Sequence, residues 1–537
     1  MKNADISKYT RKGIHMLRAS IAAIIIATTG CASMNEELLE TNLPEPPEAW
    51  TGSSQEAISS EAPTEDWLAT FGDNALYGLI DEAMAHNNQL LSASRNLEAS
   101  RSGARIARAG LLPTLNARPQ TSRNAIVTDP SIAAQSGGGD SSLGGLRANE
   151  LEDQFGVDAD NDGNLDGLDL DGDGIAEAPL PNRRIYINNF ALTAQLSWEL
   201  DIWGRISDQT RAAYKEANAT LADFYGAQMS VAGAVSRGWF VLIEARQQRE
   251  LAERDVTARE RNLRVTERRY ERGVASSLDV RLSRSALGSS KATLALRQQQ
   301  EAEASRRLEV LVGRYPAAEV EAAASLPELT ALPAAGAPLD ILSRRPDLIA
   351  AEARMEAAGL EARAAKKAML PSITISSSIS TSGPDLADVI DPERLAGNIA
   401  AGLFQPLFQG GRLKNTASQA RARAEASLLT YAQTVLEAYE EAENALAAET
   451  YLAAQEEALK LAFEEAAAAE ELTERRYAQG AATIFNLLDA QTRRISSESS
   501  YIQAQQTRVS NRVNLYLAIG GDFVTEAKSI STAAVGG

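Results

Sequence analysis

The chain has 537 residues, of which 5 % are aromatic, and a formal net charge of −19 at pH 7. Twelve acidic residues and one basic residue lie between Asp140 and Glu177, so much of this charge is local. Because nucleic-acid binding needs a basic face, we expect no nucleic-acid partner. One cysteine, two histidines and the lack of a phosphate loop or nucleophile elbow give little support for an enzyme or a catalytic cofactor.

Residues 1–30 are predicted to form a lipoprotein signal peptide. Basic residues precede an apolar segment, residues 19–29, that is too short to span a bilayer as a stable anchor. Small residues precede Cys31, as at a bacterial lipoprotein cleavage site. We expect an N-terminal lipid on Cys31; the alternative is an ordinary signal peptide cut nearby, which leaves a free thiol. Residues 31–65, rich in Pro, Glu, Ser and Thr, are expected to form an extended, lipidated linker.

Two copies of one structural plan make up most of the chain. Landmarks between Gly204 and Gly313, such as an Arg-Arg-Tyr triplet, recur 207 positions later. A repeat this long indicates a duplicated domain, because solenoid repeats are about 20 to 50 residues long. We assign the copies to residues 66–330 and 331–521, and residues 522–537 to a C-terminal tail.

An insertion distinguishes the first copy from the second. Residues 88–113 match residues 346–371 at an offset of 258 instead of 207. The difference of 51 means that additional residues lie between Pro113 and Gly204. The acidic segment lies in the same interval, and we place the insertion at about residues 120–182.

The insertion contains a pattern typical of calcium loops. Acidic residues alternate with other residues around glycines, as in loops that bind Ca²⁺ through oxygen atoms. The candidate ligands are Asp158, Asp160, Asp162, Asp166, Asp169, Asp171, Asp173 and Glu177. No glutamate stands at the twelfth position of either loop, so the pattern is closer to extracellular repeats of millimolar affinity than to sensor EF-hands. We expect Ca²⁺ binding here; the alternative is a disordered, solvated acidic loop.

Residues 190–202 alternate apolar and polar side chains over thirteen positions, which predicts an unusually long strand. The length fits a transmembrane barrel strand with an extension; a strand of a soluble sandwich is the alternative. A strand hairpin is predicted at about residues 372–409 of the second copy. Two hairpins supply only four strands, and a sheet cannot leave edges unpaired in hydrocarbon. If the strands span a membrane, several chains must therefore contribute to one barrel.

Long helical hairpins are predicted at residues 204–313 and 411–520. Each begins with 69 positions without proline, or about 100 Å of continuous α-helix. Gly273 and Gly480 follow, and glycine readily takes the left-handed conformation that ends a helix. A soluble antiparallel coiled coil would give the same pattern, so the helices alone do not identify the function.

Several short motifs carry a family resemblance through their order and spacing along the chain. They are Trp67, Phe71-Gly72-Asp73, the segment from Ser197 to Arg205, Arg269-Tyr270 with Gly273, Arg344-Arg345-Pro346-Asp347, Pro406-Leu407-Phe408, Gly410-Gly411-Arg412 and Leu487 to Gln491. This set resembles the TolC/OprM-type outer-membrane efflux proteins, in particular their NodT-like lipoprotein branch. The resemblance extends from about Trp67 to Gly521, apart from the insertion.

The resemblance implies a mainly α-helical fold with a transmembrane β portion. Four strands per chain would combine in a homotrimer into a twelve-stranded β-barrel, continuous with a periplasmic α-helical barrel. The protein would lie in the bacterial outer membrane, in contact with its lipid, and would bind a periplasmic adaptor protein and an inner-membrane pump, expected to be of the RND type. Its function would be that of the outer channel of a tripartite efflux system, conducting small molecules passively to the exterior.

The resemblance also implies roles for the turns of the two helical hairpins. The turns would contact the adaptor through Arg269, Gly273, Asp279, Arg476 and Gly480, and close the periplasmic aperture through Phe485 and Asp489. Asn486 stands where some family members carry a further acid. The alternative for the two aspartates is that they only cap helices. Two other functions remain open for the chain: a calcium-dependent surface protein or adhesin, and a periplasmic coiled-coil scaffold.

Overall fold

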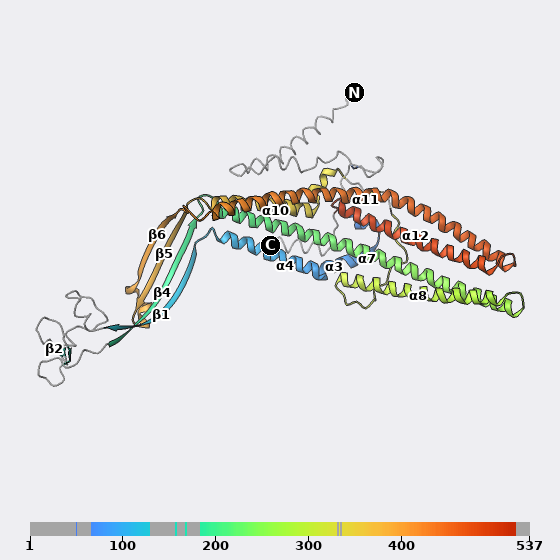
Figure 1. Ribbon diagram of the computed structural model, residues 1–537, viewed down its shortest axis with the longest axis horizontal. Coiled ribbons are helices and arrows are strands. Elements are labelled where there is room, and N and C mark those ends of the chain that lie inside the picture. The colour runs from blue at the N-terminus through green and yellow to red at the C-terminus, as the bar shows by residue number, and fades with distance from the viewer. Residues whose placement is uncertain are drawn as a thin grey trace, which may run out of the picture. The chain divides into compact units, whose positions relative to one another are not determined.

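The computed structural model describes residues 50, 66–128, 156–157, 167–168, 183–329, 332 and 336–521. The chain folds into two compact units (Figure 1). We call them the helical unit, which contains the described residues up to Ala107, residues 207–367 and the residues from Gly411 onward, and the sheet unit, which contains the described residues of 108–206 and 368–410.

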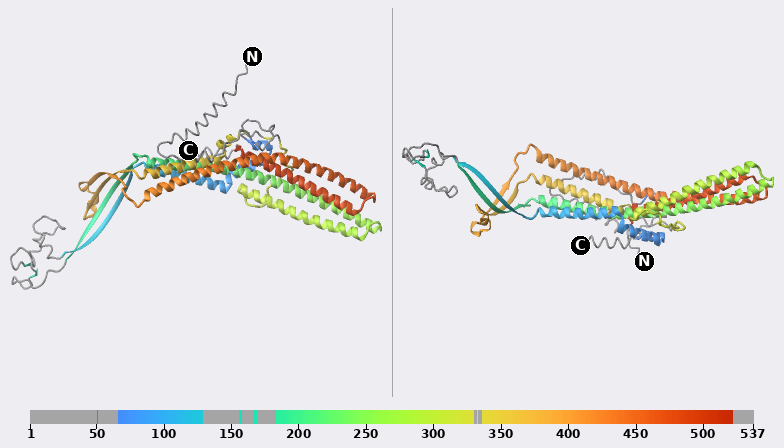
Figure 2. Two further views of the ribbon diagram at one scale, coloured as in Figure 1. Left: turned by 45° about the horizontal axis from the view of Figure 1, so that its top comes forward. Right: turned by 90° about the horizontal axis from the view of Figure 1, so that it is seen from below.

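The helical unit is built from long helices that lie side by side. Its elements are η1 (Leu68–Phe71), α3 (Asn74–His86), α4 (Asn88–Ala109), α7 (Arg205–Glu271), α8 (Ser277–Val312), η2 (Pro338–Asp340), α9 (Ile341–Arg344), α10 (Pro346–Lys367), α11 (Arg412–Ala478) and α12 (Ile484–Ala518). The two predicted long helices are confirmed, since α7 and α11 each have 67 residues. Figures 1 and 2 show α7 with α8 and α11 with α12 as antiparallel hairpins.

Aromatic side chains form the core of the helical unit where the first motif meets the long helices. Trp67 stacks on Tyr516 of α12 with ring centroids 5.6 Å apart, and Phe71 packs on Phe240 of α7 at 5.2 Å. Asp73 accepts a hydrogen bond of 2.7 Å from the indole nitrogen of Trp239. The motif that opens the first copy thus fastens the N-terminal helices to α7 and α12.

The duplication is confirmed at the level of individual contacts, in a joint that occurs twice. The Asn87 amide donates to the carbonyl of Leu311 at 2.7 Å, and the Arg345 guanidinium donates to the carbonyl of Ala518 at 3.2 Å. The two donors are 258 positions apart and the two acceptors 207 positions apart, which are the offsets found in the sequence. Each joint ties the start of a shorter helix, α4 or α10, to the last turn of a return helix, which is the second helix of a hairpin, α8 or α12.

Glycine is required at both joints. Gly313 and Gly520 have φ values of 87° and 70°, and each closes its return helix. A Cβ atom on Gly313 would lie 2.6 Å from the carbonyl oxygen of His86, and one on Gly520 would lie 2.8 Å from Cβ of Arg344. A side chain at either position is therefore excluded by both backbone conformation and space.

Substitution of Gly520 by alanine is expected to destabilise the protein by at least about 1–2 kcal/mol, the strain of the left-handed conformation alone. Gly288→Ala is the matched control, because a Cβ atom there meets nothing within 4 Å on helix α8. The control is expected to be neutral or to stabilise by about 0.5–1 kcal/mol. Thermal unfolding of the purified variants, followed by circular dichroism, compares them. Equal midpoints for the two variants would contradict the role of the joint.

Ion pairs of opposite polarity stand at equivalent positions of the two helical hairpins. In the second hairpin Glu456 of α11 pairs with Arg508 of α12, whereas in the first hairpin Arg249 of α7 pairs with Glu301 of α8. Arg249 and Glu301 lie 207 positions before Glu456 and Arg508, respectively. If α7 took α12 as its partner in this register, Arg249 would face Arg508. The reversed polarity therefore favours the correct pairing between helices of a duplicated fold.

The sheet unit is a four-stranded antiparallel sheet with the strand order β1-β4-β5-β6. Its strands are β1 (Thr114–Thr128), β4 (Arg183–Leu200), β5 (Ser372–Gly383) and β6 (Ala396–Phe404), with η3 (Leu386–Ile390) and η4 (Pro392–Arg394) between the last two. A separate pair consists of β2 (Gly156–Val157) and β3 (Gly167–Leu168). The predicted number of four strands in two hairpins is confirmed.

Three strand boundaries differ from expectation, and the first is the start of β4 at Arg183 instead of Phe190. Strand β1 continues to Thr128, past the expected start of the insertion at residue 120, because it pairs with β4 along its whole length, as far as Arg183. Strand β4 ends at Leu200, before Ile202. It ends there because the Asp201 carboxylate accepts a hydrogen bond of 2.9 Å from the backbone nitrogen of Ile206 and thereby caps helix α7.

The register of the sheet separates an apolar from a polar face. Asn116, Gln195, Ser378 and Asn398 form one row across all four strands. The neighbouring row joins Leu115, Leu196, Ser377 and Ile399. Because side chains alternate between faces along a strand, the amide row and the mainly apolar row lie on opposite faces.

Candidate functional site

The turns of the two helical hairpins meet at one end of the helical unit, and Arg269 joins them. Its guanidinium donates hydrogen bonds of 2.9 Å to the carbonyls of Tyr477 and Ala478. The same guanidinium lies 4.5 Å from the centroid of the Tyr477 ring, a cation–π contact. The Tyr477 hydroxyl also lies 3.1 Å from Oγ1 of Thr266. We call Thr266, Arg269, Tyr477 and Ala478 the tip contact.

The tip contact breaks the equivalence of the two copies. Arg269-Tyr270 and Arg476-Tyr477 are equivalent in sequence, but Tyr270 is 50 % exposed and Tyr477 only 8 %. Among the described residues, the side chain of Arg476 makes neither a hydrogen bond nor an ion pair. The sequence indicated both arginines as tip residues, and no signal in the repeated motif marked Tyr477 as the partner of Arg269.

Gly273 and Gly480 follow the C-terminal ends of α7 and α11, as predicted. Their φ values are 74° and 77°. The backbone nitrogen of Val274 donates to the carbonyl of Arg269 at 2.9 Å, and that of Ala481 donates to Arg476 at the same distance. These bonds over five residues are those of a Schellman motif, so both glycines shape the turns through the backbone.

Asp279 and Asn486 cap the return helices in the same way. The Asp279 carboxylate accepts a bond of 2.8 Å from the backbone nitrogen of Ser276, and the Asn486 amide oxygen accepts one of 3.2 Å from that of Thr483. Both pairs form capping boxes. Asp279 therefore caps α8, and the uncharged Asn486 does the same for α12 in the second copy.

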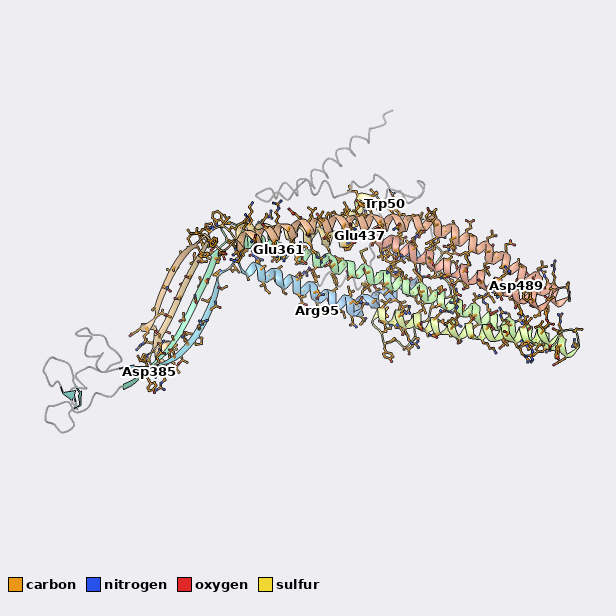
Figure 3. All side chains as sticks on the ribbon, in the orientation of Figure 1. Trp50, Arg95, Glu361, Asp385, Glu437 and Asp489 are labelled. Carbon is orange, nitrogen blue, oxygen red and sulfur yellow. The ribbon has the colours of Figure 1, made fainter. Side chains whose placement is uncertain are left out.

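Phe485 and Asp489 lie on the first two turns of α12, and Figure 3 labels Asp489. Phe485 is exposed, with 68 % of its surface accessible. Asp489 does not cap the helix, so that alternative is wrong; its carboxylate pairs with Arg493 one turn later at 2.9 Å. This hydrogen bond raises the pKa of Arg493.

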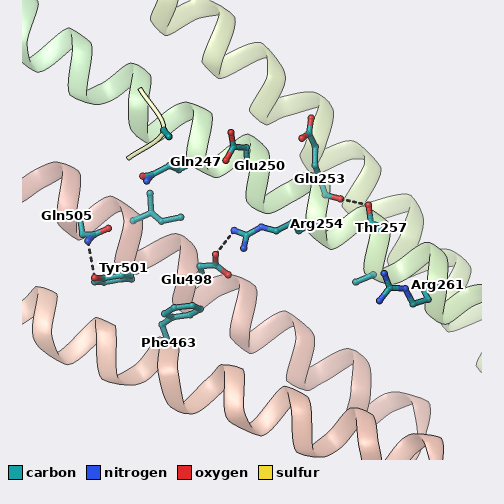
Figure 4. A pocket seen from close by; sticks show the side chains of 13 residues that line it. Gln247, Glu250, Glu253, Arg254, Thr257, Arg261, Phe463, Glu498, Tyr501 and Gln505 are labelled. Carbon is teal, nitrogen blue, oxygen red and sulfur yellow. Dashed lines mark hydrogen bonds and ion pairs between the residues drawn. The ribbon is translucent and has the colours of Figure 1, made fainter. Parts of the chain in front are cut away.

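A polar seam joins α7 to α12 above the tip contact. The Asn262 amide donates to the Gln491 side chain at 3.0 Å, and Arg254 pairs with Glu498 at 2.6 Å. Beside this ion pair a cleft of about 880 Å³ opens between the helices, and Figure 4 shows the side chains that line it. Phe463 and Tyr501, which stack on one another, belong to its apolar lining. The sequence did not reveal this seam, because isolated polar residues on a long helix do not differ from solvent-exposed ones.

Some predicted site residues lie outside the described residues. They are Cys31 and the eight candidate calcium ligands Asp158, Asp160, Asp162, Asp166, Asp169, Asp171, Asp173 and Glu177. Within the described ranges, no group of three or more His, Cys, Asp or Glu side chains is arranged to hold a metal ion. In the same part of the chain, the helices are either too short or too polar to cross a membrane.

Comparison with known proteins relates this geometry to a family. Residues 156–314 and 337–521, more than half of the chain, match the family described as outer membrane efflux protein. The pyoverdine export outer membrane protein OpmQ of Pseudomonas aeruginosa is 26 % identical over 475 residues, which cover 88 % of this chain and 90 % of OpmQ. Outer membrane protein OprJ of the same species is 26 % identical over 505 residues, covering 94 % and 96 %.

The fold is likewise similar to solved structures. The open-state structure of the MtrE outer membrane channel of Neisseria gonorrhoeae superimposes with a TM-score of 0.68 and 25 % identity, covering 90 % of this chain and 99 % of the MtrE chain. The chain belongs to the outer membrane efflux protein family.

Proposed function

We propose that the chain is the outer-membrane channel of a tripartite efflux or export system, which conducts small molecules passively to the exterior. The observation that carries the proposal is the sheet with one apolar and one amide-lined face, in a chain whose other unit consists of helical hairpins about 100 Å long. An apolar face suits lipid and a polar face suits a water-filled lumen. OpmQ and OprJ, which it resembles over most of its length, are outer membrane proteins.

Three copies complete the barrel. Strands β1 and β6 stand at the two edges of the sheet, and an edge in hydrocarbon must be paired. Three sheets of four strands give a closed barrel of twelve. A periplasmic scaffold would not need a two-faced sheet, and an adhesin would not need duplicated helical hairpins, so both alternatives leave the main features without a role.

The tips are the proposed docking end for the periplasmic adaptor, which links the channel to an inner-membrane pump of the RND type. Exposed apolar side chains there, Val274, Leu278 and Phe485, offer a surface for such a partner. Phe485 and Asp489 are proposed to line the aperture, where apolar constrictions and acidic rings set selectivity. We assign no catalytic role to the chain.

A deletion strain and a bilayer recording test the channel function. Loss of the chain is expected to increase sensitivity to dyes, detergents or drugs, and the purified trimer is expected to show single-channel conductance. Unchanged sensitivity together with no conductance would contradict the function.

Lipid attachment at Cys31 and calcium binding by the insertion are further proposals. The N-terminal lipid would anchor the chain, and the acidic loop, at the extracellular end of the first strand hairpin, would bind Ca²⁺ at millimolar concentration. Mass spectrometry of the mature protein tests the lipid. Terbium luminescence of the full chain, compared with a variant in which Asp158, Asp160 and Asp162 are asparagine, tests the loop; equal signals would contradict calcium binding.

A further inference from the structure

Helices α8 and α11 form the two lateral edges of the four long helices. Asn262 and Gln491 join α7 to α12 in the middle, while Lys291 ties α8 to α7 through Glu260. Figure 1 shows the order α11, α12, α7, α8 toward the tips, although α8 also contacts α12 directly. In a closed ring of copies, the α8 edge of one copy must therefore meet the α11 edge of the next.

Helix α11 is strongly acidic. Between Glu425 and Glu474 it carries thirteen glutamates and a single basic residue, Lys460. Glu457, Glu464 and Glu471 recur every seven residues and are exposed, so they form one stripe along the helix. Within the described chain, Glu457 and Glu464 have no ion pair, and Glu471 only approaches Arg475, at 3.8 Å. Such a column of like charges on one helix calls for a basic partner.

Helix α8 carries the opposite charge on its exposed surface. It contains six basic and four acidic residues. Of the four acids, Asp279 is used in the helix cap, and Glu309 is buried and accepts bonds from the backbone of Ala318, Glu319 and Val320. The exposed bases include Arg306 and Lys291, and the Lys291 ammonium also pairs with Glu260 of α7 at 2.9 Å.

We propose that the acidic stripe of α11 binds the basic edge of α8 in a second copy of this chain, and that these charges specify how the copies meet. The inference rests on the proposed trimeric channel and adds the residues that recognise one another. We define the height of a residue as its position along the ring axis. Rotation about this axis leaves heights unchanged, so an α8 residue of one copy faces the α11 residue of the next copy that has the same height.

Contacts within one copy fix the heights. Lys291 pairs with Glu260, which lies half a turn from Asn262 on α7, and Asn262 binds Gln491 on α12. Arg494, one turn along α12 from Gln491, pairs with Glu470 of α11. Lys291 is therefore level with Glu471 within about one turn.

The second pair follows by counting along the helices. Arg306 stands fifteen residues above Lys291, and Glu457 stands fourteen residues above Glu471, so Arg306 is level with Glu457. Both helices rise at the same 1.5 Å per residue, and the basic and acidic positions therefore match at two heights about 21 Å apart. A register error of two or more turns would separate each pair.

Disulfide trapping tests this register in the full-length protein. The variant Lys291→Cys/Glu471→Cys is expected to give disulfide-linked dimers and trimers on denaturing gels, because bridged Cα atoms must lie within about 7 Å. Lys291→Cys/Glu457→Cys is the matched control; it uses the same helices about 21 Å out of register and is expected to remain monomeric. Equal cross-linking of both variants, or none in the first, would overturn the register.

Charge reversal tests the role of the charges. Lys291→Glu with Arg306→Glu is expected to raise the concentration at which the trimer dissociates by about tenfold, since like charges then face one another. Adding Glu457→Lys and Glu471→Lys is expected to restore it, which separates recognition from misfolding. An unchanged trimer in the first variant, or no rescue in the second, would overturn the inference. If the wild-type trimer conducts ions in either case, the proposed function stands.

Discussion

Replacement of Arg512 by methionine is expected to destabilise the helical unit by about 3–5 kcal/mol. Arg512 of α12 pairs with Glu449 of α11 at 2.8 Å, and both side chains are 2 % exposed. Without the arginine, the Glu449 carboxylate would stay buried without a positive partner. It would keep the hydrogen bond of 3.0 Å that the Asn511 amide donates to it. The midpoint of thermal or chemical unfolding of the purified protein measures the loss.

Two controls separate the buried charge from a general effect of losing an ion pair. Arg95→Met removes a pair on α4 whose side chains are 80 % and 68 % exposed, and it is expected to cost less than about 1 kcal/mol. The double variant Glu449→Leu/Arg512→Met removes both buried charges and is expected to recover most of the stability. An Arg512→Met variant as stable as Arg95→Met would show that Glu449 is not held as a buried charge.

The helices and the duplication could be predicted because they depend on patterns that repeat along the chain. Long segments without proline, closed by Gly273 and Gly480, predicted the length of α7 and α11 almost to the residue. The two offsets predicted a shared plan, and the joints at Gly313 and Gly520 confirm it. Such features depend on local backbone preferences, which the sequence carries directly.

The features that were missed depend on contacts between segments that are distant in the sequence. Arg269 and Arg476 stand in the same motif, yet Arg269 contacts the tyrosine of the other copy and Arg476 does not. The reason is that the two turns pack against one another in a single orientation. The end of β1 at Thr128 was missed for a related reason: pairing with β4 extends the strand where its own sequence shows no alternation. Tertiary contacts decide both cases.

The exchange of polarity between the equivalent ion pairs is visible in the sequence only once the pairing is known. Arg249 and Glu456 occupy equivalent positions and carry opposite charges, a difference that has no meaning in the sequence alone. Their partners Glu301 and Arg508 differ in the opposite sense. The joint change preserves attraction within each hairpin.

Loss of the Arg269 side chain is expected to loosen the contact between the two tips and to shift the channel toward its open state by about tenfold or more, seen as a higher open probability in bilayer recordings. Arg269→Ala removes two hydrogen bonds to the carbonyls of Tyr477 and Ala478 and the cation–π contact with the Tyr477 ring. Hydrogen bonds that involve a charged group contribute about 1.5–3 kcal/mol each when shielded, and less at a partly exposed site such as this one. Even a part of that sum shifts a closed-to-open equilibrium more than tenfold, because about 1.4 kcal/mol corresponds to a factor of ten.

Arg476→Ala is the matched control, because it removes the equivalent arginine of the second copy, which has no such contact among the described residues. Bilayer recordings of both variants, together with uptake of a large antibiotic by cells that express them, measure the opening. Tyr477→Phe keeps the ring and removes the hydroxyl that faces Thr266, so its effect is expected to be smaller than that of Arg269→Ala. If both arginine variants conducted like the wild type, the tip contact would not control the aperture; if both opened equally, the net charge of the tips would control it instead of the contact made by Arg269.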